Sequence, residues 1–428
     1  MTLAEALGVQ SISQSHLAVG GSTVKSAGAN FIHFGVEWLQ LAPTDIDPTD
    51  YNWAIYDPSF DLASTLGFEV MVTLGHNPMW AASFRRGPID CVPMERFTDY
   101  VTTVVTRYSA PPYNVKFWAL YNEPDVVSFT RSEGSPLDCS GDLEAPAFGD
   151  HPAEYVATLA AAYNAIKAVD QDAVVLVGGI AHDNFDYEGG FFNEDFLDQI
   201  LAEGAGDYFD AMNFHYYPKY DWRWEERTGL PGLIGKTKMI GELMAAYGID
   251  KPIVVSELGD SSGHPHDPSN RTLDTQAIAV IQLFTRAIAA GNKFAIWYNM
   301  NDYANDPNFG EHGLLDYPDF NSKPSLDAFK TLATYLPGHV FKRPLSRTEM
   351  GAANLEGYLF LEISNHKHLY ILWSRDSTVQ TITLPSGVSS VVDKFGDPVV
   401  HGLTLVLDDQ PVLITCDPER SCLPLVSD

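Results

Sequence analysis

A helix followed by a strand can be read directly from YVATLAAAYNAIKAVDQDAVVLVGG (155–179). Its first part repeats large side chains every three or four residues, which places them on one face of a helix: Tyr155, Leu159, Ala162 and Ile166. The run AVVLVGG (173–179) then contains no polar side chain. Such a run is typical of a strand buried on both faces of a parallel sheet. The segment therefore predicts one unit of an α/β fold.

The same alternation of apolar runs and helical segments repeats along most of the chain. Six further runs are rich in β-branched and aromatic residues: FIHFGVEW (31–38), FEVMVTLGH (68–76), VKFWALYNE (115–123), FDAMNFHYY (209–217), PIVVSELG (252–259) and FAIWYNM (294–300). An additional strand is expected near SISQSHL (11–17), where the pattern is weakest. Seven or eight β–α units favour a (β/α)8 TIM barrel. A doubly wound sheet is the alternative, although no G-x-G-x-x-G follows the early strands.

The C-terminal part of the chain has a different period. KPSLDAFKTLATYL (323–336) is expected to be the closing helix of the barrel. Short β-rich runs then recur at roughly ten-residue spacing, which is typical of a β-sandwich: YLFLEIS (358–364), HLYILWS (368–374), VQTITL (379–384), SVVDKF (390–395), LTLVL (403–407) and PVLITC (411–416). We therefore expect a (β/α)8 barrel over residues 1–337 and an accessory all-β sandwich over residues 338–428. Their short connection predicts a packed appendage rather than a tethered module.

The composition excludes several kinds of partner. The 428 residues include 56 Asp and Glu against 26 Lys and Arg, and the net charge is −30. A surface this acidic repels phosphate groups, which argues against nucleic acids and anionic membranes as partners. No apolar run approaches the roughly 18 residues of a membrane helix, and the first ten residues lack the pattern of a signal peptide.

The four cysteines fall into two local sets, Cys91 with Cys139 and Cys416 with Cys422. None has the C-x-x-C spacing of a zinc or redox site, and no histidine cluster accompanies them. They are either isolated thiols or two short disulfides, and all three pairings remain formally open. Two disulfides would imply an oxidising compartment. On that alternative we expect a secreted or extracytoplasmic protein whose signal peptide has already been removed.

Two glutamates follow apolar runs that otherwise avoid charge: Glu123 in WALYNEPD and Glu257 in VVSELGD. In a barrel, the chemistry lies where strands end and their loops begin. A half-buried carboxylate costs several kcal/mol unless it is paired, so each position needs a reason. One alternative is that each glutamate caps a helix or pairs with an arginine. The other is that both face one bound group, as retaining glycoside hydrolysis requires at about 5–5.5 Å.

These motifs, in their order along the chain, resemble clan A of the retaining β-glycoside hydrolases. The resemblance covers roughly residues 28–336 and rests on AGANFIHFGVEW (27–38), residues 50–81, NEP (122–124), HYYP (215–218), SE (256–257) and Trp297. Within the clan, the arrangement is most similar to glycoside hydrolase families 39 and 5. The dipeptide Asn-Glu alone is a weak signal, whereas the ordered set is specific.

The resemblance implies a role for individual residues. Glu123 would be the general acid/base and Glu257 the nucleophile of a double displacement on β-linked oligo- or polysaccharides. Five further residues would complete the site: Asn122 at the sugar 2-hydroxyl, Tyr217 at Glu257, Trp297 as the floor of the sugar subsite, and His76 and His215 at other hydroxyls. A strand-end tyrosine or tryptophan can also fill the core, and either histidine can be structural. No cofactor is implied.

The end of the second predicted strand departs from the clan. The clan often has an arginine there, in contact with the nucleophile, whereas this chain has His33. A neutral histidine cannot supply the fixed positive charge that lowers the pKa of a carboxylate. Either His33 is protonated beside Glu257, or another group replaces the arginine, or the substrate is handled differently. Glu37, at the rim of the pocket, and Trp38 are further candidates for substrate binding.

Two loops bear on the substrate. Residues 126–152 form a long loop after the acid/base, and a Cys91–Cys139 bridge would connect it to the preceding β–α loop. In YDWRWEER (220–227), Trp222 and Trp224 either bind sugars at outer subsites or pack on the barrel.

Three functions compete for this sequence. The first is a retaining β-glycosidase with a carbohydrate substrate. The second is a catalytically silent carbohydrate-binding barrel, which the presence of both glutamates argues against. The third is another barrel enzyme, such as a metal-dependent hydrolase or an aldolase, but neither a strand-end lysine nor a His-x-His at the first strand is present. His264, His266 and Asp267 lack a matching partner, so no metal is expected.

Overall fold

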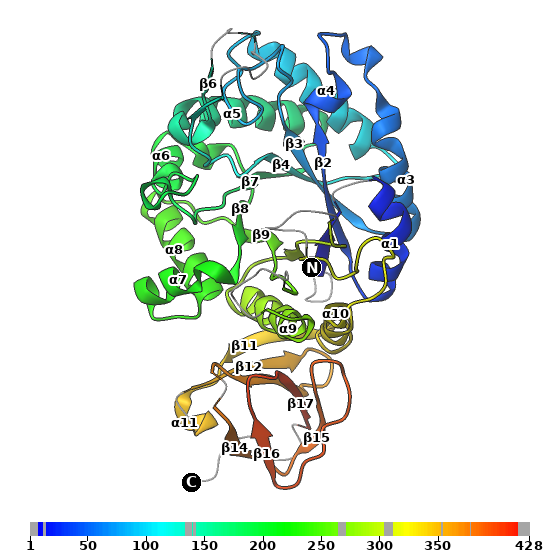
Figure 1. Cartoon of the computed structure of the whole chain (residues 1–428), viewed down its shortest axis with the longest axis vertical. Coiled ribbons are helices and arrows are strands. Elements are labelled where there is room, and N and C mark those ends of the chain that lie inside the picture. The colour runs from blue at the N-terminus through cyan, green and yellow to red at the C-terminus, as the bar shows by residue number, and fades with distance from the viewer. Residues whose placement is uncertain are drawn as a thin grey trace. The chain divides into compact units, whose positions relative to one another are not determined.

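The computed structural model describes residues 7–11, 14–132, 139, 143–263, 271–303, 311–351, 354–376 and 378–417. Within these residues, eight strands make one sheet in the order β7-β4-β3-β2-β1-β10-β9-β8. Parallel bridges from Leu176 to Ala211 and from Ile180 to Phe214 join β7 to β8, so the two ends of this order meet. Helices alternate with the strands along the chain (Figure 1). The predicted (β/α)8 TIM barrel is confirmed.

Each apolar run predicted between residues 31 and 300 contains one strand of the barrel. The strands are β1 (Leu7–Gln10), β2 (Phe31–Glu37), β3 (Glu69–Gly75), β4 (Phe117–Asn122), β7 (Val174–Gly179), β8 (Met212–Tyr216), β9 (Ile253–Leu258) and β10 (Ala295–Trp297). The main helices are α1 (Gln14–Ser26), α3 (Asp57–Leu66), α4 (Met94–Ser109), α5 (Pro152–Val169), α6 (Phe196–Ala202), α7 (Asp221–Thr228), α8 (Gly232–Ala246), α9 (Leu273–Ala289) and α10 (Pro324–Tyr335).

The strand predicted near residues 11–17 is wrong. The first strand is β1, in which Leu7 and Val9 are fully buried, and α1 already begins at Gln14. Leu17 lies within this helix, and its side chain packs over Gly21, one turn later, where an added Cβ would lie 3.0 Å from it. The apolar residues of this segment follow a helical period rather than a strand period.

The C-terminal strands form two antiparallel sheets with a shared core. The larger sheet has the order β11-β12-β13-β17-β15, and the smaller sheet pairs β14 with β16. Their bounds are β11 (His339–Pro344), β12 (Leu355–Glu362), β13 (His368–Ser374), β14 (Gln380–Thr383), β15 (Val388–Val392), β16 (Thr404–Leu407) and β17 (Val412–Cys416). Tyr370 and Ile414 from the larger sheet share one apolar cluster with Ile382 and Leu405 from the smaller. The predicted sandwich is confirmed, and β11 is an additional strand.

The chain forms two compact units. One comprises Gln10–Gly21 and Phe31–Leu258, and the other comprises Met1–Val9, Ser22–Asn30 and Gly259–Asp428. Within the second unit, Arg286 on α9 donates two hydrogen bonds to Glu356 on β12, at 2.8 and 2.9 Å. Both side chains are buried. This pair attaches the sandwich to a helix of the barrel sequence, and the division at residue 337 stays a prediction.

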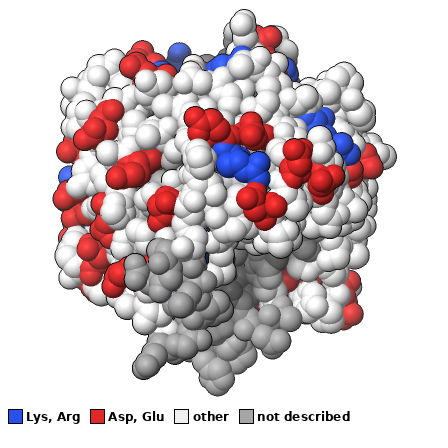
Figure 2. Space-filling view, turned by 90° about the horizontal axis from the view of Figure 1, so that it is seen from above, with Lys and Arg blue, Asp and Glu red and all other residues white. Residues whose placement is uncertain are grey.

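Acidic side chains are scattered over the face of the molecule in Figure 2, with few basic side chains among them. This distribution agrees with the net charge of −30. Among the residues with a described structure, no helix combines the length and the apolar character needed to cross a membrane.

Candidate active site

Three titratable side chains meet at the carboxyl ends of the barrel strands. Glu123 directly follows β4, His215 lies in β8, and Glu257 lies near the end of β9. His215 Nδ1 is 3.2 Å from Glu123 Oε1 and 3.7 Å from Glu257 Oε2. One ligand atom from each of the three side chains lies within 4.8 Å of the other two. We call this group the Glu–His–Glu cluster.

The backbone around the cluster is shaped to bring His215 between the glutamates. A Cβ on Gly179, at the end of β7, would lie 2.1 Å from His215 Nε2, so only glycine leaves room for the ring. The register of β8 against β9 shifts after Phe214, which sets His215 opposite Glu257. Such irregularities re-aim side chains beside active sites. Glu123 itself has a φ of 49°, a left-handed conformation that is rare outside glycine and that clusters at functional sites.

Each glutamate has its own set of partners. Tyr217 Oη donates a hydrogen bond to Glu257 Oε1, and the Gln10 side chain also hydrogen-bonds this carboxylate. Arg86 Nη1 lies 3.5 Å from Glu123 Oε2. The same Arg86 atom donates to the backbone carbonyl of Asn122, the last residue of β4, at 3.4 Å. Glu123 therefore faces the fixed cation Arg86, whereas the hydrogen bonds to Glu257 come from the neutral Tyr217 and Gln10, with His215 at 3.7 Å.

Burial and charge shift the pKa values of the cluster in different directions. Burial raises the pKa of Glu257, and the negative charge of Glu123 adds to this effect. Burial also acts to raise the pKa of Glu123, but His215 and Arg86 outweigh it, and this pKa lies below the usual glutamate value. Burial acts to lower the pKa of His215, but the two carboxylates outweigh it and raise that pKa above the usual histidine value. These directions favour a charged His215 beside a charged Glu123.

His33 is not a protonated partner of Glu257. It lies buried in β2, and its Nε2 is 2.8 Å from Thr73 Oγ1. Burial, followed by the charge of His215, lowers the pKa of His33 to about 3, so the ring is neutral at physiological pH. This low pKa argues against the alternative in which His33 carries the missing positive charge. The cations close to the two glutamates are instead His215 and Arg86.

Two other predicted site residues form a pair of their own. Glu37 ends β2, and His76 directly follows β3. His76 Nδ1 lies 2.8 Å from Glu37 Oε1, and Gln40 Nε2 donates to Glu37 Oε2 at 2.6 Å. Both members of the pair are partly exposed. Their contact with sugar hydroxyls stays a prediction, as does the contact of Asn122.

The two predicted tryptophans have no exposed surface. Trp38 stacks on Tyr100 with ring centres 5.4 Å apart. Trp297 ends β10, which belongs to the compact unit that does not contain the Glu–His–Glu cluster. Its indole N–H donates to the His312 carbonyl at 2.9 Å. Both rings fill core positions, which is the alternative that the sequence left open. Sugar binding by either residue stays a prediction.

Lys236 is a functional candidate that the sequence analysis missed. Its ammonium group is completely buried and donates to the His215 carbonyl at 2.9 Å and to Asp183 Oδ2 at 2.6 Å. Its charge also contributes to the low pKa of Glu123. Its position on the buried face could have been predicted from the helical period. Lys236 stands three residues after Leu233 and four before Ile240, on the apolar stripe of α8. Arg86, also missed, lies in a loop where no periodicity marks it.

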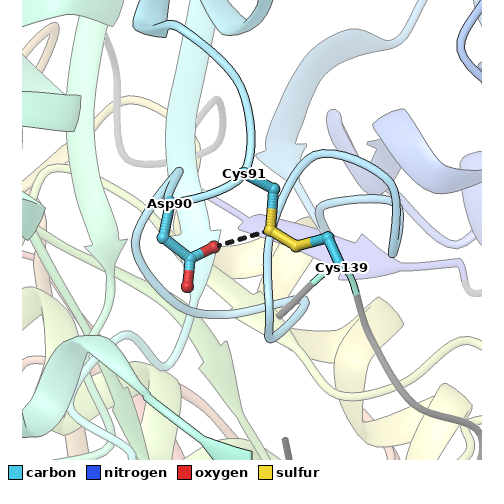
Figure 3. A group of neighbouring side chains, drawn as sticks. All are labelled: Asp90, Cys91 and Cys139. Carbon is cyan, nitrogen blue, oxygen red and sulfur yellow. Dashed lines mark hydrogen bonds between the residues drawn. A yellow bond between two sulfur atoms is a disulfide. The ribbon is translucent and has the colours of Figure 1, made fainter. Parts of the chain in front are cut away.

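The loop that carries Arg86 is cross-linked to the long loop after Glu123. Cys91 and Cys139, 48 residues apart, form a disulfide, which is the first of the two predicted pairs. Figure 3 shows this bridge with the carboxylate of Asp90, whose Oδ1 lies 3.3 Å from Cys91 Sγ. In the long loop, β5 (Phe129–Thr130) and β6 (Glu144–Ala145) pair antiparallel.

The second predicted disulfide extends beyond the described residues. Cys416 is buried at the end of β17 and is disulfide-bonded. Cys422 lies outside the described residues.

Among the described residues, two groups of side chains have the spacing of metal ligands. In the first, Asp90, Cys91 and Cys139, both sulfurs belong to the disulfide and offer no thiolate. The second is the Glu–His–Glu cluster. There the positive charge of Arg86, 3.5 Å from Glu123, opposes the binding of a further cation. The histidines and aspartate at 264, 266 and 267 lie outside the described residues.

Comparison with known proteins adds a family and a fold. The sequence profile of the cellulase family (glycosyl hydrolase family 5) matches residues 11–302, about two-thirds of the chain. No curated protein matches the sequence significantly. A family 39 glycoside hydrolase from Bacteroides cellulosilyticus WH2 is similar in structure, with a TM-score of 0.71 and 18% identity over 97% of this chain and 82% of that chain.

Two further solved structures share the fold. A glucosidase from Croceicoccus marinus gives a TM-score of 0.61 with 14% identity, over 96% of this chain and 95% of that chain. A family 51 α-L-arabinofuranosidase from Bifidobacterium longum gives 0.62 with 11% identity, over 97% and 96%. The profile covers the strands that bear Glu123, His215 and Glu257, and it distinguishes between the two families that the motifs left open. The chain belongs to the cellulase family, glycosyl hydrolase family 5, and is a clan A glycoside hydrolase.

Proposed function

We propose that this glycoside hydrolase cleaves β-linked oligo- or polysaccharides by double displacement, with Glu123 as general acid/base and Glu257 as nucleophile. The separation of the two carboxylates supports this best, because an oxygen of Glu123 and an oxygen of Glu257 lie within 4.8 Å of each other. Retaining enzymes hold their carboxyl groups about 5–5.5 Å apart, whereas inverting enzymes need about 6.5–9.5 Å to admit a water molecule.

In the first step, Glu257 attacks the anomeric carbon while Glu123 protonates the departing oxygen, and the glycosidic bond breaks. The hydrogen bonds from Tyr217 and Gln10 stabilise the ionised form of Glu257 and orient it. In the second step, Glu123 removes a proton from water, which attacks the glycosyl-enzyme and releases the sugar with its original configuration.

The general acid needs a proton on Glu123, yet the pKa of Glu123 lies below the usual glutamate value and that of Glu257 lies above it. These directions are opposite to the proposed roles, because Glu123 faces Arg86 and His215 while Glu257 faces Glu123. The 3.2 Å contact between His215 Nδ1 and Glu123 Oε1 offers a direct path for transfer. We propose that a proton passes from His215 to Glu123 across this hydrogen bond when the substrate binds.

Alanine variants separate the two roles. Glu123→Ala should impair substrates with basic leaving groups by about 10²–10⁴-fold, whereas activated aryl glycosides need little proton assistance. Glu257→Ala should abolish turnover of both kinds, because no glycosyl-enzyme forms. Glu69→Ala is the matched control, since Glu69 is an exposed glutamate at the amino end of β3. Equal losses in both variants on both substrates would contradict the division of labour.

The stereochemistry of the products gives an independent test. Azide should attack the covalent intermediate in Glu123→Ala and give the β-glycosyl azide. In Glu257→Ala it should enter from the vacated side and give the α-anomer. Hydrolysis by the unmodified enzyme, followed by proton NMR, should release the β-anomer first. Initial release of the α-anomer would mean inversion and refute the two-step mechanism.

The sugar and the compartment are further parts of the proposal. The similar structures include a glucosidase and an arabinofuranosidase, so the fold alone does not select one sugar. A panel of aryl β-glycosides, β-glucans, xylans and mannans would identify it. We also propose a secreted or extracytoplasmic location, which the Cys91–Cys139 disulfide supports. Recovery of the bridge as free thiols from the native source would contradict that location.

A further inference from the structure

Two exposed aromatic side chains lie in the segments that follow the carboxyl ends of β7 and β8. Tyr187 lies in the loop after β7 and is 61% exposed, and Trp222 lies in α7, after β8, and is 52% exposed. Trp224 is completely buried, and its indole N–H donates to Asp183 Oδ1 at 2.9 Å. Of the two tryptophans that the sequence offered as sugar platforms, only Trp222 presents its ring to solvent.

One buried arginine holds both exposed rings. Arg223 is only 3% exposed, its Nη1 donates to Tyr187 Oη at 3.2 Å, and its guanidinium carbon lies 5.0 Å from the centre of the Trp222 ring. Glu188 forms an ion pair with the same guanidinium. Tyr187 also stacks on buried Phe185, with ring centres 5.7 Å apart. The Tyr187–Trp222 platform is therefore preorganised, and a ligand would not have to immobilise its side chains.

The loop that carries Tyr187 is attached to the segment that follows Glu123. The backbone N–H groups of Ala181 and His182 donate to the Asp125 carboxylate at 3.1 and 2.7 Å. Further along the same loop, the N–H of Val127 donates to the Phe191 carbonyl at 2.9 Å. The platform is thus fixed on the Glu123 side of the catalytic cluster.

The helix that carries Trp222 is also linked to the cluster. Trp224 on α7 contacts Asp183, which pairs with Lys236, and Lys236 donates to the His215 carbonyl. Tyr220, directly before α7, is half-buried, and the charges of Asp183 and Glu123 reinforce the rise in its pKa that burial causes. Tyr220 therefore lies within electrostatic reach of both Asp183 and Glu123.

We propose that the Tyr187–Trp222 platform is an outer subsite that binds a neutral sugar ring in the leaving-group half of the substrate. The inference rests on the proposed function, because the general acid stands at the departing oxygen and the loops fixed to it border the departing half. The C–H face of a pyranose is apolar and packs on aromatic rings, while Tyr187 Oη and Glu188 offer polar contacts at the edge. A net charge of −30 favours neutral over anionic saccharides.

Binding tests the platform without hydrolysis. Glu257→Ala protein is titrated calorimetrically with neutral β-1,4-linked hexasaccharides of glucose, xylose and mannose. Adding Trp222→Ala should weaken the best hexasaccharide by about tenfold, which corresponds to about 1.4 kcal/mol, and Trp222→Phe should retain most of the affinity. The control is Tyr247→Ala. Tyr247 is 40% exposed and follows α8, at the opposite end of the barrel from the strand carboxyl ends, so its loss should leave the affinity unchanged.

Kinetics separate this inference from the proposed function. With Glu257 intact, Trp222→Ala should lower kcat/KM for the hexasaccharide but not for an aryl monoglycoside, which has no second sugar. Equal losses on both substrates, unchanged hexasaccharide affinity, or no binding of any hexasaccharide would overturn the platform. If the unmodified enzyme hydrolyses nothing while hexasaccharide binding still depends on Trp222, the proposed function fails and the sugar subsite stands.

Discussion

Removing one partner of the ion pair between α9 and the sandwich should destabilise the protein strongly. In Glu356→Gln the side chain keeps its shape, but Arg286 loses the carboxylate that accepts its hydrogen bonds at 2.8 and 2.9 Å. Tyr358 Oη, 2.6 Å away, and Arg375, at 3.6 Å, lose the same partner. Removing one charge of a buried ion pair in this way costs about 3–5 kcal/mol. That is a large part of the roughly 5–15 kcal/mol by which a typical protein is stable.

Urea unfolding, followed by tryptophan fluorescence, measures this loss. The control is Glu349→Gln, which removes a carboxylate from the more exposed pair with Arg343 and should cost no more than about 1 kcal/mol. Burial acts to raise the pKa of Glu356, but Arg286 outweighs it, and the pKa lies below the usual glutamate value. The stabilisation is therefore present above the unfolded pKa of about 4.3 and disappears as the pH falls through the folded value. A loss equal to that of the control would refute the reasoning.

Other parts of the structure make comparable predictions. Lys236→Met leaves the Asp183 carboxylate buried without its cation and should cost about 3–5 kcal/mol in urea unfolding, and a loss below about 1 kcal/mol would contradict the buried pair. Burial is the main reason that the pKa of Asp125 and the pKa of Asp183 are both raised to about 6, above an unfolded value of about 3.9. The folded state binds protons more tightly at these two carboxyls, so their contribution to stability should grow as the pH is lowered from about 7.5 to about 5. The low pKa of buried His33 acts in the opposite direction. The check therefore compares the pH dependence of the thermal midpoint of Asp125→Asn with that of the unmodified protein, and identical dependences would be inconsistent with the shift of Asp125. Thiol titration of the denatured, unreduced protein should find no free thiol at Cys91, whereas a reactive thiol there would rule out the bridge. Excision of residues 338–428 should lower the thermal midpoint, and a soluble, fully active barrel with an unchanged midpoint would disprove the packed appendage.

The sequence predicted the barrel strands because their burial on both faces removes polar side chains from the run. β9 and β7 are examples, since each is almost entirely buried. β1 was not predicted, because it has only four residues and is too short to show a period. β11 was not predicted either. Every second residue of β11 is more exposed, as expected at the edge of a sheet, and the strand contains charged residues.

The candidate site was predictable to the extent that its residues stand at strand ends. Glu123 and Glu257 are charges that end apolar runs, and the structure brings their carboxylates together. Arg86 and Lys236 were not predictable in this way, because their roles depend on where a loop and a helix return to the same strand ends. For His33 the position was predictable but the charge was not. The sequence predicted its place in β2, whereas its pKa depends on burial and on the nearby His215.

The disulfide has a consequence for the integrity of the enzyme. The covalent ring closed by Cys91 and Cys139 contains α4, β4 and Glu123, together with the part of the long loop after β4 that precedes Cys139. If a protease cut the backbone once within that ring, both fragments would stay attached through the sulfur bridge. A nicked molecule would then run as a single chain without reducing agent and as two pieces with it. A cut between Glu123 and Cys139 would therefore not release Glu123 from the part of the chain that carries Glu257.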